Sequence, residues 1–239
     1  MTAPFIVAHL YRRRMNIYGD TGNVTALRRR LEWRGVEVRV VSVDEGDSFD
    51  LEEADIVVAG GGEDSSQLAI AGDLVARGDA VHRAVGAGVV FLTVCGTYQL
   101  FGRRFVTSEG SEIPGIGVFA AETIGGGTRM IGNVVVDSPW GSLVGFENHS
   151  GRTGLDPGQA SLGRVRRGFG NDDTSGAEGA VVGNCFGTYL HGSVLPKNPG
   201  FADELIRRAL HRRTGSDVDL APLDDAVEER AAAVAASRP

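Results

Sequence analysis

The sequence VVFLTVCG, residues 89–96, is a continuous apolar run that ends in a cysteine and a glycine. Such a run is typical of a central strand that is buried on both faces of a sheet. The residues from Tyr98 to Phe101 favour a helix, so the chain turns sharply from strand to helix at Cys95. This turn indicates an α/β fold with a functional site at the carboxyl ends of its strands.

Strands and helices alternate on the N-terminal side of this run. Apolar, β-branched stretches predict the strands, and amphipathic stretches predict the helices. We expect Asp20 or Thr21 to cap the first of these helices and Gly35 to end it. The alternation predicts a doubly wound, mostly parallel sheet flanked by helices. The predicted strands are 5–10, 36–43 and 55–59, and the predicted helices are 21–33 and 64–86, the second of them broken near Gly72.

The second half of the chain has a different pattern. Strand signals separated by turns predict extra antiparallel strands at 129–137, 143–146, 180–182 and 186–190, followed by a last helix at 198–211. We place one domain over residues 1–212. Residues 213–239 are acidic and rich in alanine, and we interpret them as a C-terminal tail that could hold one helix at 224–236.

Composition and charge narrow the class of protein. The 239 residues include 35 glycines, and the formal net charge of −7 argues against nucleic acid as a general partner. We interpret the arginines at 12–14 as a local run and those at 28–30 as a solvated helix face; a phosphate-binding patch is the less favoured alternative. No early stretch has the pattern of a secretory signal, and no run is apolar enough to span a membrane, so we expect a cytoplasmic protein.

Cys95 is the first candidate for chemistry. A tight strand-to-helix turn lifts a thiol out of the sheet and sets the positive end of a helix and free N–H groups behind it, and both favour the reactive thiolate. The nucleophiles of other α/β enzymes occupy such turns. The alternative is a buried core cysteine, which is how we interpret Cys185 in its own apolar run.

His191 is the second candidate. It follows the predicted strand 186–190, so a strand again delivers a polar side chain into a loop that contains glycine. Taken alone, it is better explained as a structural histidine. However, histidine is the usual base near neutral pH, and a Cys–His pair that is distant in sequence is the usual arrangement for thiol acyl transfer. Together, Cys95 and His191 predict a catalytic dyad.

A glycine run supplies the third part of the predicted site. Gly60, Gly61 and Gly62 follow the predicted strand 55–59, and glycines allow backbone N–H groups to approach an oxyanion closely. We assign one oxyanion donor to Gly61 or Gly62 and the other to Gly96. Phosphate binding is the alternative for such a run, but the Gly-Lys-Ser/Thr signature of a P-loop is absent. No cysteine or histidine spacing suggests a metal.

Two runs resemble the signatures of a known family. VCGTYQ at 94–99 and GTYLHG at 187–192 are similar to those of the cobyric-acid-synthase-type branch of class I glutamine amidotransferases, which have a flavodoxin-like fold. Within that branch the chain resembles the GatD-type glutaminase subunits of lipid II isoglutaminyl synthase. The narrower resemblance covers nearly all of residues 5–211 and is carried by HLY at 9–11, MNIYGDTGN at 15–23, GGED at 61–64 and GFENHSGRT at 145–153.

The resemblance implies a specific chemistry. Cys95 would attack the side-chain amide of glutamine, and His191 would handle the protons that release ammonia. Arg129 and Gln99 would bind glutamine, the arginine by a bidentate contact with the α-carboxylate. The ammonia would pass to a Mur-ligase-like, MurT-type partner in a heterodimer. That partner would bind ATP and Mg²⁺ and amidate the D-glutamate of lipid II, so no cofactor is expected in this chain.

Two positions depart from the family pattern. Thr97 stands where a second glycine is usual, which predicts a crowded turn. Ser193 stands two residues after His191, where many class I enzymes carry a carboxylate that orients the histidine. His191 would then work as one half of a dyad, or borrow Asp20, Glu147 or a carboxylate of the partner. For this reason we expect low glutaminase activity from the isolated subunit.

Other assignments stay open at the level of sequence. His149 lies in a polar segment that would line the site or the ammonia path, or do neither, whereas His82 and His211 fall in helical patterns and are expected on the surface. Two further functions fit the same residues. One is an amidotransferase that supplies ammonia for a corrin or similar acid, and the other is a catalytically silent scaffold subunit that kept the fold.

Overall fold

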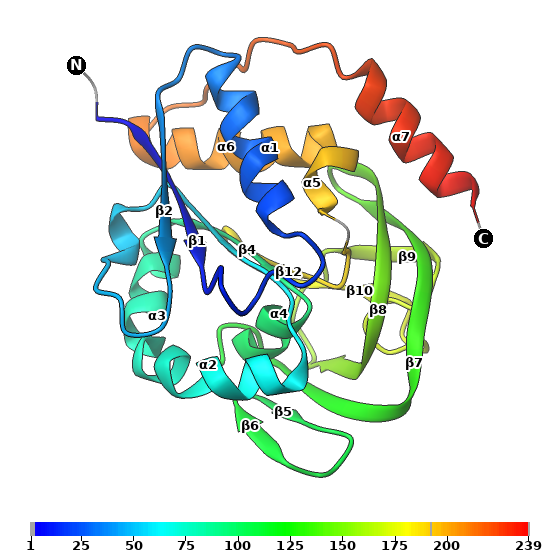
Figure 1. Ribbon diagram of the computed structural model, residues 1–239. Helices are drawn as coiled ribbons and strands as arrows, with labels where there is room; N and C mark the ends of the chain where they lie inside the picture. The colour runs from blue at the N-terminus through cyan, green and yellow to red at the C-terminus, as the bar shows by residue number, and fades with distance from the viewer. Residues whose placement is uncertain (1–2, 192, 239) are drawn as a thin grey trace.

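A mostly parallel sheet forms the centre of the computed structural model, which describes residues 3–191 and 193–238 (Figure 1). Its strands run in the order β11-β12-β4-β3-β1-β2, and every neighbouring pair is parallel except β11 and β12. The parallel part therefore has the flavodoxin-like strand order. The strands are β1 (Phe5–Leu10), β2 (Val38–Val43), β3 (Ile56–Ala59), β4 (Val90–Val94), β11 (Ala180–Val182) and β12 (Cys185–Thr188).

Helices cover both faces of this sheet. On one face α1 packs over β1 and β2 while α6 packs over β3 and β4, and α2, α3 and α4 lie on the other (Figure 1). Strands β3 and β4 are buried at every residue, as expected for a sheet covered on both sides. These findings confirm the predicted α/β fold. The helices are α1 (Thr21–Glu32), a 3-10 turn η1 (Leu51–Glu53), α2 (Asp64–Ala76), α3 (Gly78–Gly86), α4 (Gly96–Phe101) and α6 (Pro199–Thr214).

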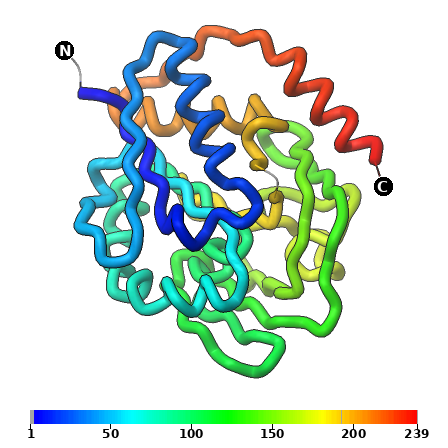
Figure 2. Tube along the Cα trace, viewed as in Figure 1, coloured from blue at the N-terminus to red at the C-terminus, as the bar shows by residue number. Residues whose placement is uncertain are grey.

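A second sheet stands beside the first and runs in the order β10-β9-β7-β5-β6. Its main feature is a long antiparallel hairpin of β7 and β8, which Figure 2 shows in green and whose β8 strand contacts α5. The strands are β5 (Arg104–Val106), β6 (Glu112–Pro114), β7 (Ala121–Ser138), β8 (Gly141–Leu155), β9 (Gly163–Arg167) and β10 (Ala177–Glu178).

The hairpin is much longer than the predicted strand pair at 129–137 and 143–146. Glycines at 125–127 and polar residues on both strands hide the alternation that marks a strand, and the register shifts between Gly125 and Met130. The sequence pattern also misses β5, β6, β9, β10 and the short helix α5 (Val194–Lys197). A last helix, α7 (Ala226–Ser237), packs against α5, β7 and β8.

Three local predictions are wrong. The helical stretch at 64–86 is interrupted at Arg77, between α2 and α3, and not at Gly72; an exposed helix tolerates one glycine at a penalty of about 1 kcal/mol. Neither Asp20 nor Thr21 caps α1 through its side chain, because Asn16 Oδ1 accepts the Thr21 N–H at 2.8 Å instead.

The third wrong prediction concerns the arginines at 28–30. Arg30 does not lie on a solvated helix face: its side chain is buried and donates to Asp203 at 2.7 Å and to Asp225 at 2.5 Å. A buried guanidinium needs paired carboxylates to offset its desolvation. This ion-pair cluster joins α1 to α6 and to the start of α7.

Candidate active site

The turn after β4 holds Cys95 in a strained conformation. Its backbone has φ 52° and ψ −107°, which a non-glycine residue adopts at a penalty of about 1–3 kcal/mol. Gly96 is closely packed, since a Cβ there would lie 2.9 Å from Met15 Cε and 3.1 Å from the Gln67 side chain. The Thr97 hydroxyl donates to the Ala59 carbonyl at 2.7 Å and accepts the Val94 N–H at 3.2 Å. Thr97 therefore does not crowd the sulfur; it ties the ends of β3 and β4 together.

His191 follows β12 and pairs with the hairpin. Its N–H donates to the Phe146 carbonyl at 2.7 Å, and its carbonyl accepts the Phe146 N–H at 3.3 Å. The imidazole is buried, and its ring centroid lies 4.3 Å from that of the Tyr18 ring. Neither ring nitrogen has a hydrogen-bond partner among the described residues.

Gly61 lies between the two candidate side chains. A Cβ at Gly61 would lie 3.2 Å from Cys95 Cβ and 3.2 Å from His191 Cε1. The structure therefore brings Cys95 and His191 to the same point at the carboxyl ends of β4, β12 and β3, although nearly a hundred residues separate them in sequence.

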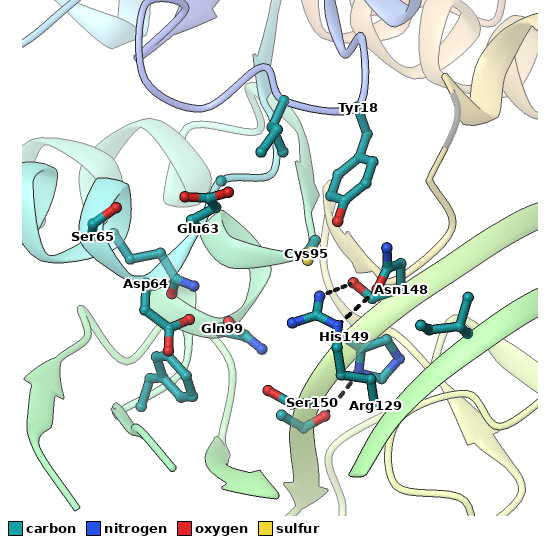
Figure 3. A pocket seen from close by; sticks show the side chains of 16 residues that line it. Tyr18, Glu63, Asp64, Ser65, Cys95, Gln99, Arg129, Asn148, His149 and Ser150 are labelled. Atoms are coloured by element: carbon teal, nitrogen blue, oxygen red, sulfur yellow. Dashed lines mark hydrogen bonds between the residues drawn. The ribbon is translucent and has the colours of Figure 1, made fainter. Parts of the chain in front are cut away.

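A cavity of about 510 Å³ opens at Cys95. Figure 3 shows Arg129 of β7 reaching into it from the side of the hairpin, while Glu63, Asp64 and Ser65 line the opposite wall. Arg129 Nε donates to Asn148 Oδ1 at 3.0 Å. The lining residues are Ile17, Tyr18, Gly62, Glu63, Asp64, Ser65, Gln67, Cys95, Gln99, Phe105, Arg129, Ile131, Asn148, His149, Ser150 and Gly151.

Two residues at the bottom of the cavity, here called its floor, contact Tyr189. Gln99 Nε2 donates to the Tyr189 hydroxyl at 3.0 Å. His149 lies in β8 rather than in a loop, lines the cavity, and stacks on Tyr189 with 3.6 Å between ring centroids. Its Nδ1 lies 2.8 Å from the Gly151 carbonyl, so this nitrogen carries the proton.

The electrostatics of the site favour neutral side chains. Burial raises the pKa of the Cys95 thiol to about 12, and the negative charge of Asp20 adds to the shift, whereas the Gly96 N–H opposes it. Burial lowers the pKa of His191 to about 3, and repulsion from His149 and Arg129 acts in the same direction. The expected thiolate is therefore not the stable form in this structure, because desolvation outweighs the helix N-terminus.

The two carboxylates considered as orienting acids do not contact the His191 ring nitrogens. Asp20 Oδ2 accepts the Gly61 N–H at 3.0 Å. Glu147 accepts the N–H groups of Phe169 and Gly170 at 2.7 and 2.8 Å and lies 3.8 Å from His149 Nε2. Both carboxylates are used elsewhere, so neither completes a triad in this conformation.

The same contact bears on the choice between Gly61 and Gly62 as an oxyanion donor. Because the Gly61 N–H is bonded to Asp20, it is not available to an oxyanion here. Gly62 lines the cavity, and the Gly96 N–H is near enough to the Cys95 sulfur to oppose the rise in the pKa of the thiol. Gly62 and Gly96 are therefore the glycine donors that the structure leaves for this task.

Several other predictions can be placed. Cys185 is a free, fully buried residue of β12. His82 and His211 lie exposed on α3 and α6. Sequence reasoning did not identify Tyr18, Asp64 or Asn148 as cavity residues, although each lies in one of the short runs that carry the narrower resemblance.

Comparison with known proteins decides the family. The CobB/CobQ-like glutamine amidotransferase domain matches residues 6–199, most of the chain. The chain belongs to this family. The amidotransferase is 38% identical over 208 residues to the lipid II isoglutaminyl synthase (glutamine-hydrolyzing) subunit GatD of Staphylococcus aureus (strain N315), covering 87% of this chain and 85% of that protein. It is 37% identical over 229 residues to the subunit of the same name from Streptococcus pneumoniae (strain R6), covering 95% and 88%.

The fold agrees with a solved glutaminase domain. The amidotransferase superposes on the glutaminase domain of Trypanosoma brucei CTPS with a TM-score of 0.57, covering 91% of this chain and 96% of that domain at 12% identity. At this identity the likeness shows the fold alone. The family match and the two relatives, rather than this likeness, identify the chain as a glutamine amidotransferase.

Metal sites and membrane spans are both lacking in the described part of the amidotransferase. No group of three or more His, Cys, Asp or Glu side chains within 3–191 and 193–238 is arranged to hold a metal ion. No helix in that part of the chain is long and apolar enough to cross a membrane.

Proposed function

We propose that this chain hydrolyses glutamine at Cys95, with His191 as the base, and passes the ammonia to a Mur-ligase-like partner that amidates the D-glutamate of lipid II. The observation that carries the proposal is that Cys95 and His191 lie on either side of Gly61. A Cβ at Gly61 would lie 3.2 Å from each of these side chains. The sulfur also lines a cavity that presents Arg129, a group suited to an amino-acid carboxylate.

The reaction requires a covalent intermediate. His191 takes the thiol proton, and the Cys95 sulfur bonds to the carboxamide carbon of glutamine. The tetrahedral intermediate then loses its C–N bond, and His191 returns the proton to the leaving nitrogen, which departs as ammonia. Water, activated by the same imidazole, hydrolyses the thioester to glutamate and restores the thiol. The net reaction consumes one glutamine and one water.

Charge on the two cavity walls suits glutamine. Arg129 extends from the hairpin, where Asn148 fixes its guanidinium, and it would pair with the α-carboxylate. Glu63 and Asp64 at the start of α2 lie on the other wall and would attract the α-ammonium. Gln99 would contact the substrate from the floor. The oxyanion would receive hydrogen bonds from the Gly96 and Gly62 N–H groups.

The acceptor and the partner are proposed from the relatives. Two proteins that are 37–38% identical to this chain over most of its length are subunits of lipid II isoglutaminyl synthase. A subunit that only releases ammonia needs a second chain to consume it, and ATP and Mg²⁺ would bind there. The partner would also supply the change that the site needs, because Cys95 and His191 are both neutral and not hydrogen-bonded to each other in this structure.

An ammonia-release assay tests the proposal. Purified chain is incubated with glutamine, alone and with a Mur-ligase-like partner, and each reaction is repeated with Cys95→Ala. We expect slow release by the chain alone and stimulation of about 10-fold or more by the partner, which is a typical coupling between subunits. Full activity of the chain alone, unchanged by the partner, would contradict the proposed dependence.

The acceptor needs its own experiment, since the matched domain family is also named for CobB and CobQ. The complete complex is supplied with glutamine and ATP and offered either lipid II or a corrin acid. Amidation of lipid II supports the proposal. Amidation of the corrin acid, or co-purification with a corrinoid enzyme, would replace the proposed acceptor.

A further inference from the structure

The run NIYGDTGN, residues 16–23, marks the narrower resemblance, but the proposed chemistry gives it no role. In the structure this run lies between two parts of the site. One is the glycine loop, residues 60–62. The other, here called the histidine segment, consists of His191 and residues 193–195. A run that touches both parts is placed to set their relative position.

The contacts with the glycine loop hold Gly61 on both sides. Asp20 Oδ2 accepts the Gly61 N–H at 3.0 Å, and the Ile17 N–H donates to the Gly61 carbonyl at 3.2 Å. Gly60 packs directly on the carboxylate, because a Cβ there would lie 2.5 Å from Asp20 Cγ. The orientation of the Gly61 peptide therefore depends on the run that contains Asp20.

The contacts with the histidine segment use neighbouring residues of the same run. Asn23 Oδ1 accepts the Leu195 N–H at 3.0 Å, and the Ser193 hydroxyl donates to the Gly19 carbonyl at 2.6 Å. A Cβ at Gly22 would collide with Ser193 Oγ, so the two chain segments are in close contact.

One hydrogen bond joins the two sides. Asn23 Nδ2 donates to Asp20 Oδ1 at 3.4 Å, and both side chains are fully buried. We propose that Asp20 and Asn23 form a bracket that holds the histidine segment in register with the glycine loop. Asp20 is thus a positioning residue that acts through Gly61, and Asn23 is one that acts through Leu195. The inference rests on the proposed roles of Cys95 and His191.

A purely local role explains these contacts less well. Asp20 stands at the start of α1, where such residues usually cap the helix, but Asn16 makes that contact instead. Burying a carboxylate without a cationic partner is unfavourable, and burial raises the pKa of Asp20 to about 6. The benefit that offsets this penalty lies in the glycine loop, since Gly61 lies between Cys95 and His191, where a Cβ would be 3.2 Å from each side chain.

Exchange of the two side chains provides the test. In Asp20→Asn an amide NH₂ group would face the NH₂ group of Asn23, and in Asn23→Asp two buried carboxylates would face each other. In the double variant the amide at position 20 accepts from Gly61 and donates to the carboxylate at position 23, which in turn accepts from Leu195. All three hydrogen bonds are then restored, while the negative charge moves from position 20 to position 23. Rescue of this kind distinguishes a bracket from two unrelated structural contacts.

The first readout is amide hydrogen exchange in the full chain, which does not depend on glutamine. We expect Asp20→Asn to speed exchange about tenfold, the factor for one buried hydrogen bond, at Leu195 as well as at Gly61. The double variant should restore protection at both. Loss at Gly61 alone would overturn the proposal. If the single variants do not fold, a folded double variant supports the bracket, and an unfolded one overturns it.

The second readout is glutamine hydrolysis. Each single variant should lower kcat about 10- to 100-fold with KM for glutamine within about threefold, because a small displacement of the catalytic groups affects the chemical step most. The double variant should recover to within about threefold. Single variants with unchanged kcat, or a folded double variant no faster than the slower single, would overturn the proposal. If the wild-type chain does not hydrolyse glutamine even in complex with its partner, the proposed function fails, while hydrogen exchange still decides the bracket.

Discussion

The cysteine side and the histidine side of the site are built differently. Cys95 stands in a strained turn, with Thr97 tying the adjacent strands and the Gly96 N–H on its sulfur. His191 is held by its backbone and by the Tyr18 ring, while both imidazole nitrogens lack partners among the residues described. The proposed nucleophile thus has polar contacts around it, whereas the ring of the proposed base has none among the described residues. On the proposed mechanism, the change needed for activity therefore falls on the imidazole of His191.

The largest expected effect comes from removing the thiol of Cys95. Cys95→Ala should lower glutamine hydrolysis by at least about 10³-fold, because no thioester can form. The matched control is Cys185→Ala, which removes the other buried thiol from β12. It should leave kcat within about threefold. Ammonia release measured with both variants separates the two cysteines, and equal losses would contradict the assignment of the nucleophile.

Removing the imidazole of His191 should have a smaller effect. His191→Gln is expected to lower kcat about 10²- to 10⁴-fold, the usual contribution of a general base. His82→Gln, an exposed histidine of α3, is the control and should retain activity. If His191→Gln is as active as the control, the histidine side has no part in proton transfer.

Substitution of Arg129, on the cavity wall proposed to bind glutamine, should change KM for glutamine. Arg129→Ala is expected to raise KM for glutamine about 10- to 100-fold with little change in kcat, since a charge-assisted hydrogen bond contributes about 1.5–3 kcal/mol to binding. Arg166→Ala removes an exposed arginine that pairs with Asp137 at the far end of the hairpin. Steady-state kinetics of the two variants should differ in KM; a loss confined to kcat would place Arg129 elsewhere in the mechanism.

The pH dependence of thiol reactivity should show the smallest effect. Because burial and the Asp20 charge raise the pKa of Cys95 to about 12, the fraction of thiolate keeps increasing with pH throughout the alkaline range. Alkylation of Cys95 by iodoacetamide in the free chain should therefore rise without a plateau to about pH 10, whereas an ordinary cysteine levels off above its pKa of about 8.5. A plateau below about pH 9 would show that the thiolate is stabilised after all.

Much of this site could be predicted because the sequence patterns that mark it are short and local. The apolar run before Cys95, the glycines at 60–62 and the strand before His191 each consist of a few consecutive residues, and a parallel sheet brings such strand ends together. The predicted mostly parallel sheet and the two candidate catalytic positions at its strand ends follow from that rule.

The parts that could not be predicted depend on partners distant in sequence. Asp20 contacts Gly61, Arg30 pairs with Asp203, and Asn23 bonds to Leu195, and nothing in the local sequence names those partners. The protonation state was also missed, since the helix N-terminus is visible in the sequence while the desolvation of the thiol is not. Composition and spacing record which groups are present, but burial decides their charge.

Capture of the covalent intermediate tests the central claim most directly. The chain, with its partner, is mixed with glutamine, quenched in acid within the first turnovers, and digested for mass spectrometry. The account predicts a γ-glutamyl group on the peptide that contains Cys95, and its absence in Cys95→Ala. A γ-glutamyl group on any other residue, or ammonia release with no acyl-enzyme at any quench time, would contradict it.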